Sequence, residues 1–228
     1  MNQALTVRST LALKGVLQKL APQFEREAGL RLELLYDATQ EILRLIAAGE
    51  GGADLYILTS EAMGELQKQG KVGSVRVLGS SGVGVAVRAG AKRPDIGTVD
   101  AFTKALLAAE SVAHSKVGAS GIYFSGILER LGIAGRLKKR VIVEKGPVGA
   151  VVASGGAEIG VQQLCELAPV AGIDIVGGLP QGLQKLTSFS AGISPKSQFQ
   201  EKAGALVEFL CSTAGRTELT KGRIEPAS

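Results

Sequence analysis

The sequence of 228 residues contains no tryptophan, a single histidine and two cysteines, and aromatic side chains make up 4% of it. It has no stretch of roughly 20 apolar residues, as a membrane span requires, and no charged segment followed by an apolar one at its start. Metal-ligand spacings, a phosphate-binding loop and a catalytic triad are also missing. These absences argue against a membrane-spanning protein, a kinase and a hydrolase, and we expect no metal and no cofactor.

Basic residues outnumber acidic ones, and the net charge is +5 with a pI near 9.3. This balance favours anionic partners. The chain has no run of five Lys or Arg. We interpret its densest basic cluster, residues 138–140, as the solvent-exposed end of a helix. We therefore expect a small anion as the partner and no nucleic acid.

The two cysteines, Cys165 and Cys211, lie far apart within helix-like apolar patterns. This placement favours two buried free thiols, and a disulfide is the alternative. With 45% hydrophobic residues the chain is long enough to bury a sizeable core in one or two domains.

One unit recurs in the first part of the chain: a short strand, a turn with hydroxyl side chains, and an amphipathic helix. The strands are predicted at residues 5–8, 30–36 and 53–58. In open α/β sheets, ligands bind at the carboxyl ends of the strands. The hydroxyl residues expected there are Ser9, Thr10, Thr39, Thr59 and Ser60. The alternative is that each hydroxyl only caps its helix.

A second anion-binding turn is predicted within residues 111–124, where a buried strand leads through a Gly/Ser turn into a helix. Unpaired N–H groups at a helix start attract anions, and residues 118–121 are small enough for close approach. Ser120 either caps the helix or binds the ligand, and Lys116 adds a positive charge. An ordinary capped connection is the alternative.

The remaining pattern predicts two α/β lobes. A small-residue strand at 82–88 crosses into the second lobe, and strands follow at 140–143, 157–163, 173–177 and 186–193, with Pro147 starting a short helix. A closing helix begins near Gln198. We predict lobe I at residues 1–80 plus 186–228 and lobe II at 81–185, with hinges near Ser81 and Thr187 and a ligand cleft between the lobes.

The order of several motifs resembles the type II periplasmic solute-binding proteins, in the molybdate-binding-protein-like branch, over nearly the whole chain. The motifs lie at residues 17–29, 53–60, 118–123, 152–160, 179–184, 209–215 and 222–226. The resemblance implies a two-lobed fold, a small anionic ligand, a periplasmic location, a membrane ABC transporter as partner, and a monomer.

The resemblance also implies a ligand set. The molybdate binders hold their oxyanion with hydroxyls and amides, which match Ser9 or Thr10, Thr39, Ser120 with Gly121, Val148 or Gly149, and Gln162. Gln162 stands where that family has a tyrosine, which favours an organic ligand with carboxylates. The full predicted ligand set is Arg8, Ser9, Thr10, Thr39, Thr59, Lys116, Ser120, Gly121, Tyr123, Val148, Gly149 and Gln162.

Two functions remain open. One is an extracytoplasmic binding protein that captures an organic di- or tricarboxylate or an oxyanion. The other is an enzyme, because this branch also resembles aconitate isomerase, which needs a base that moves a proton. The candidate catalytic residues are His114 and Lys116, followed by Glu144 and Tyr123. The alternative for His114 is a packed side chain.

Overall fold

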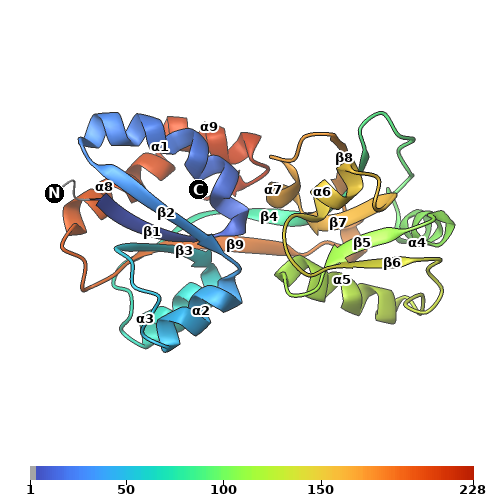
Figure 1. The fold of residues 1–228 in the computed structure, drawn as a ribbon, viewed down its shortest axis with the longest axis horizontal. Helices are drawn as coiled ribbons and strands as arrows, with labels where there is room; N and C mark the ends of the chain where they lie inside the picture. Colours follow the sequence, from blue (N-terminus) through green and yellow to red (C-terminus); the bar gives the residue numbers. More distant parts are fainter. Residues whose placement is uncertain (1–3) are drawn as a thin grey trace. The chain divides into compact units, whose positions relative to one another are not determined.

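The structure, a computed structural model, describes residues 4–228 as a mixed α/β fold (Figure 1). Backbone contacts divide the chain into two compact units: unit one is Met1–Ser81 with Thr187–Ser228, and unit two is Gly82–Leu186. This division differs by one residue at each crossing from the predicted lobe boundaries. That the units act as hinged lobes stays a prediction.

Unit one is built on four adjoining strands in the order β2, β1, β3, β9. They are β1 (Ala4–Thr10), β2 (Arg31–Asp37), β3 (Leu55–Thr59) and β9 (Leu186–Ile193). β1 runs parallel to β2 and to β3, whereas β9 runs antiparallel to β3. The carboxyl ends of β1, β2 and β3 therefore lie at one edge of the sheet.

Helices cover both faces of this sheet (Figure 1). On one side lie α2 (Thr39–Ala47) and α3 (Ser60–Lys68); on the other lie α1 (Lys14–Ala28), α8 (Gln200–Cys211) and α9 (Thr213–Lys221). A 3-10 turn, η1 (Leu11–Leu13), joins β1 to α1. The single closing helix expected from residue 198 onward is thus two helices, because Ser212 has extended backbone angles and caps α9.

Unit two has the strand order β4, β7, β5, β6. These strands are β4 (Val75–Arg88), β5 (Val112–Ser115), β6 (Arg140–Val143) and β7 (Ile159–Gln163), and β8 (Ile173–Gly178) pairs with β4. β5 runs parallel to β6 and β7, so their carboxyl ends share an edge. The crossing strand predicted at 82–88 starts earlier, since β4 spans the boundary between the units and pairs with β10 (Glu225–Pro226) at its first half.

Two apolar clusters hold the unit-two helices on opposite faces. α4 (Val99–Ala108) and α5 (Ala119–Arg130) bury Phe102 and Phe124 against one face, whereas α6 (Val148–Ala153) packs Val148 and Val152 against the other. Gly160 permits this approach, because a Cβ there would lie 2.6 Å from Val152 Cγ2. The short α7 (Leu164–Leu167) follows β7, and η2 (Gln181–Leu183) precedes β9.

Among residues 4–228 neither cysteine forms a disulfide, as predicted. Cys165 is buried, but Cys211 is only partly buried, which corrects the expectation of two buried thiols. Within residues 4–228, none of the helices combines the length and apolar character that a bilayer crossing demands.

Candidate functional site

The hydroxyl residues predicted in unit one lie at one strand edge. Ser9 is level with Tyr36 of β2 and with Ile57 of β3, so Thr10, Thr39 and Thr59 all follow at the carboxyl ends of parallel neighbours. The repeated unit of strand, hydroxyl turn and helix thus brings its turns together by sheet pairing alone.

The hydroxyls at this edge differ in their partners. Thr59 accepts a hydrogen bond from Ala62 N at 3.4 Å and so caps α3, and the neighbouring Ser60 Oγ lies 2.7 Å from Ser190 Oγ. Ser9 Oγ is fully buried and donates to Thr10 O at 3.0 Å. By contrast, Thr10 precedes η1 without a side-chain capping bond, and Thr39 is the first residue of α2, whose N-cap is Ala38. The capping alternative therefore applies to Thr59 and not to Thr10 or Thr39.

Arg8 places a guanidinium beside these turns. Its side chain is 11% exposed, and Nη1 lies 3.6 Å from Asp37 Oδ2, which is beyond hydrogen-bond length. Its Nε is buried and has no hydrogen-bond partner among residues 4–228. Buried donors are nearly always satisfied, so this atom is available to donate to a group from outside the chain, either water or a ligand.

Tyr36 is a polar residue of this edge that the sequence analysis missed. Its hydroxyl is also buried without a partner in the described part of the chain. Burial raises the pKa of Tyr36 to about 12, so the phenol stays protonated and able to donate. Lys14 Nζ lies 5.7 Å from the ring centroid. In the pairing of β1 with β2, Tyr36 lies opposite Ser9, and Arg8 lies opposite Leu35. The two buried donors without partners, Arg8 Nε and the Tyr36 hydroxyl, therefore lie on opposite faces of the sheet.

The anion turn predicted in unit two has a different construction. Gly118, not Ser120, is the N-cap of α5, and Ser115 Oγ accepts from Gly118 N at 3.0 Å. Of the two alternatives for Ser120, the helix cap is therefore wrong, and the ligand contact stays a prediction. Ser120 is the second residue of α5, is 4% exposed, and its hydroxyl forms no hydrogen bond to another described residue.

Gly121 shows how tightly this turn is packed. A Cβ at Gly121 would lie 1.9 Å from Ser115 O, so the first turn of α5 sits directly against the end of β5. Glycine is required here by backbone contact within the unit, which gives Gly121 a structural role beside any role as an amide donor.

Lys116 and Tyr123 have partners of their own. Lys116 Nζ lies 2.9 Å from Glu144 Oε1, and both side chains are largely exposed. Tyr123 donates its hydroxyl hydrogen to Leu183 O at 3.1 Å, and Lys185 Nζ lies 5.3 Å from its ring centroid. The predicted ligand roles of Lys116 and Tyr123 would require these contacts to be shared.

His114 is a packed residue in this structure. It is 2% exposed, and its ring lies 5.4 Å from that of Phe124. Arg140 Nε donates to Nε2 at 2.9 Å, so Nδ1 carries the hydrogen and donates to Ser115 O at 3.0 Å. Burial lowers the pKa of His114, the bond to Ser115 opposes this shift, and the Arg140 charge adds to it. With both nitrogens engaged, this geometry favours the packed alternative over a catalytic base.

Gln162 forms a network in place of the expected tyrosine. It is 3% exposed; its Oε1 accepts from Val148 N at 2.8 Å, and its Nε2 donates to Glu166 Oε2. The Val148 amide predicted to bind the ligand is thus already engaged, and Gly149 is buried at the start of α6. The sequence analysis missed Glu166. Burial raises the pKa of Glu166, and the bond from Gln162 partly opposes this shift.

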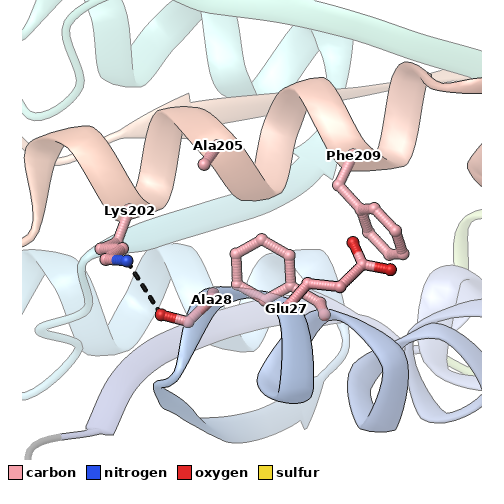
Figure 2. Close-up of a pocket in the computed structure, with 6 residues that line it drawn as sticks. Glu27, Ala28, Lys202, Ala205 and Phe209 are labelled. Carbon is pink, nitrogen blue, oxygen red and sulfur yellow. Dashed lines mark hydrogen bonds between the residues drawn. The ribbon is translucent and has the colours of Figure 1, made fainter.

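A cavity of about 280 Å³ lies elsewhere, between α1 and α8 of unit one (Figure 2). Figure 2 shows Glu27 beside Phe209, and Lys202 Nζ donates to Ala28 O at 2.8 Å. None of the predicted ligand residues lines this cavity. In the part of the chain that the structure describes, no group of three or more His, Cys, Asp and Glu side chains is arranged to hold a metal.

Comparison with known proteins places the chain in a family. The sequence profile of the bacterial extracellular solute-binding proteins matches residues 5–222. An aconitate isomerase from a Pseudomonas species is 39% identical over 232 residues, covering 97% of this chain and 87% of that protein. The chain therefore belongs to the bacterial extracellular solute-binding protein family, and the predicted resemblance is confirmed.

Solved structures agree on the fold. The periplasmic molybdate-binding protein of Azotobacter vinelandii matches with a TM-score of 0.76 at 20% identity, covering 98% of this chain and all of that one. The substrate-binding domain of a putative molybdenum ABC transporter from Clostridium difficile matches with a TM-score of 0.74 at 19% identity, covering 99% of both chains. The predicted periplasmic-binding-protein fold class is confirmed.

Proposed function

We propose that this protein captures a small organic polycarboxylate or oxyanion outside the cytoplasm and, as a monomer, delivers it to a membrane ABC transporter. The observation that carries the proposal is the buried Arg8 guanidinium beside the hydroxyl turns of unit one, whose Nε has no hydrogen-bond partner within residues 4–228. A buried unsatisfied donor costs about 1–3 kcal/mol, and a ligand carboxylate would remove that cost.

The residues proposed to hold the anion are those that keep a free polar atom. In unit one these are Arg8, Thr10 and Thr39, and in unit two they are Ser120 and the remaining N–H of Gln162. Guanidinium groups bind carboxylates through two parallel hydrogen bonds, which favours a carboxylate ligand over a neutral one. Relatives and neighbours named for aconitate and for molybdate are consistent with an anionic ligand.

A second candidate function is the isomerisation of aconitate. The observation in its favour is the 39% identity to an aconitate isomerase over 97% of this chain. The reaction needs a base that takes a proton from carbon and returns one to the substrate, which leaves the composition unchanged. The packed His114 is a poor base for this step. Any such base must come from another residue.

Calorimetric titration tests the first proposal. We expect trans-aconitate or citrate to bind, molybdate to bind more weakly, and glucose not to bind. The variant Arg8→Met should lose carboxylate binding, whereas the exposed Arg26→Met serves as the matched control. Binding of glucose alone, or unchanged carboxylate affinity in Arg8→Met, would contradict the proposal. Incubation with cis-aconitate, followed by NMR for the trans isomer, separates the isomerase from the carrier.

A further inference from the structure

The pair formed by Gln162 and Glu166 has an unusual position in unit two. Gln162 lies on the face of β7 that packs against α6, and Glu166 follows it in α7. The amide of Gln162 has a fixed orientation, because Val148 N–H needs an acceptor and therefore faces Oε1. Nε2 must then face Glu166, and its other hydrogen remains free to donate.

Glu166 has no cation to balance its charge. Among residues 4–228, no Lys, Arg or His forms an ion pair with it. The elements packed against α7 are β7, α6, β8 and, at Gly84 beside Leu164, β4. Their titratable side chains are Asp174, which lies 3.5 Å from Arg93 Nη2, and the exposed Arg76 and Arg88 of β4. α7 itself adds the buried Cys165. The loop before α6 adds Lys145 and Glu144, and Glu144 pairs with Lys116.

An anion bound by Gln162 would share one NH2 group with the Glu166 carboxylate. Two acceptors on the same NH2 group lie only a few ångströms apart, so two negative charges there repel each other beside the buried Gln162 amide. Uptake of a proton by Glu166 removes one of the charges and leaves its hydrogen bond from Gln162 in place. Burial already raises the pKa of this carboxyl, in the same direction as the shift that a bound anion would cause.

We infer that Glu166 links anion capture to proton uptake: the protein binds one proton at Glu166 when an anion binds at Gln162. This inference rests on the proposed function, because it assumes that Gln162 contacts the ligand. Glu166 acts here as a positioning residue through Gln162. The linkage makes the protein discriminate against anions at high pH, with affinity falling up to tenfold per pH unit where Glu166 is ionised in the free protein.

The test is calorimetry of trans-aconitate binding in two buffers with different ionisation enthalpies, from pH 5.5 to 8.5. The difference in heat gives the number of protons taken up. We expect a net uptake of protons on binding, of at most one per anion, within this range. Glu166→Gln should bind with no uptake and a flat pH dependence of affinity. Glu129→Gln, an exposed carboxyl on α5 of the same unit, should behave as the unchanged protein.

Each outcome is decisive. Binding without proton uptake at any pH, or the same uptake in Glu166→Gln, would overturn this inference and leave the proposed function standing. If neither trans-aconitate nor citrate gives any heat of binding, the proposed function fails and this inference fails with it. Should Glu166→Gln fold poorly, a carbon-13 NMR titration of the Glu166 carboxyl, with and without trans-aconitate, replaces it; an unchanged pKa then overturns the inference.

Discussion

The two strand edges of this protein satisfy their polar groups in opposite ways. In unit one, Arg8 Nε and the Tyr36 hydroxyl are buried without partners among the described residues. In unit two, the polar side chains have partners within the unit: Gln162 accepts from the Val148 backbone N–H and donates to Glu166, and His114 accepts from Arg140. The first edge is ready to donate to a ligand, whereas the second must rearrange or share its bonds.

This difference has an energetic meaning. Buried donors without partners lower the stability of the ligand-free protein. A ligand that accepts hydrogen bonds from them removes this cost and so binds more tightly. A closed network stabilises the empty protein instead, and a ligand gains less by entering it. Substitutions in unit one should therefore change affinity more than stability, and those in the unit-two network should do the reverse.

The largest effect is expected for Gly121→Ala. Its Cβ would meet Ser115 O at 1.9 Å, so the end of β5 or the start of α5 must move, at a cost of about 3 kcal/mol. Gly126→Ala is the matched control in the same helix, because no heavy atom lies within 4 Å of its Cβ. It should stabilise the protein by about 0.5–1 kcal/mol. Urea denaturation measures both, and equal stabilities would mean that the unit-two edge is loosely packed.

Arg8→Met should have the largest effect on binding. Loss of charged hydrogen bonds to a carboxylate costs about 1.5–3 kcal/mol, or roughly tenfold to a hundredfold in affinity. The stability of the empty protein should hardly fall, because the nearest carboxylate, that of Asp37, is 3.6 Å away. Calorimetry and denaturation on the same samples separate the two quantities. If Arg8→Met instead loses much stability and keeps its affinity, the unit-one edge contributes to stability and not to binding, which contradicts the expected difference between the two edges.

Ser120→Ala tests whether unit two also offers a free donor. Because Gly118 is the cap of α5, losing the Ser120 hydroxyl should change stability by less than about 0.5 kcal/mol. If the hydroxyl contacts the anion, affinity should fall about tenfold. A lowered melting temperature with unchanged affinity would remove Ser120 from the proposed site. Ser125→Ala, which removes a hydrogen bond from Arg140, is the control for a purely structural serine.

The sequence predicted the fold well for a physical reason. Strand alternation, helical periodicity and hydroxyl turns are local signals, and parallel pairing then places Ser9, Thr10, Thr39 and Thr59 at one edge without further information. The fold class needed only these signals and the order of the motifs.

The site was harder to predict, because partners come from distant segments. Whether Ser120 caps α5 depended on where the helix begins: its N-cap is Gly118, two residues earlier, and the Gly118 N–H donates to Ser115 Oγ. Tyr36 and Glu166 were missed since neither sits in a recognisable motif. Burial raises the pKa of both residues, and burial depends on segments distant in the sequence, which no local pattern reveals.

The tyrosines provide a matched comparison between the units. Tyr36→Phe removes a buried hydroxyl that lacks a partner, so the empty protein should gain up to about 1 kcal/mol of stability. Tyr123→Phe removes the bond to Leu183 O and should lose about 1 kcal/mol. Denaturation midpoints measured without ligand give the sign of each change. If both variants lose the same amount of stability, the Tyr36 hydroxyl has a hydrogen-bond partner in solution. The two units would then not differ in how they satisfy their buried tyrosines.

The smallest effect concerns His114 and pH. Its pKa is lowered in the folded protein, so between its ordinary value of about 6.5 and the lower folded value only the unfolded chain binds the proton. Stability should therefore fall as pH falls below about 6.5, and should level off below the folded pKa. Glu166, with its raised pKa, acts in the opposite direction, since its contribution is present at low pH and is lost as pH rises. The slope is best measured by urea denaturation in a Glu166→Gln background, with His114→Gln as the variant that cannot titrate. If stability still falls below pH 6.5 in His114→Gln, the histidine is not the group whose protonation destabilises the protein.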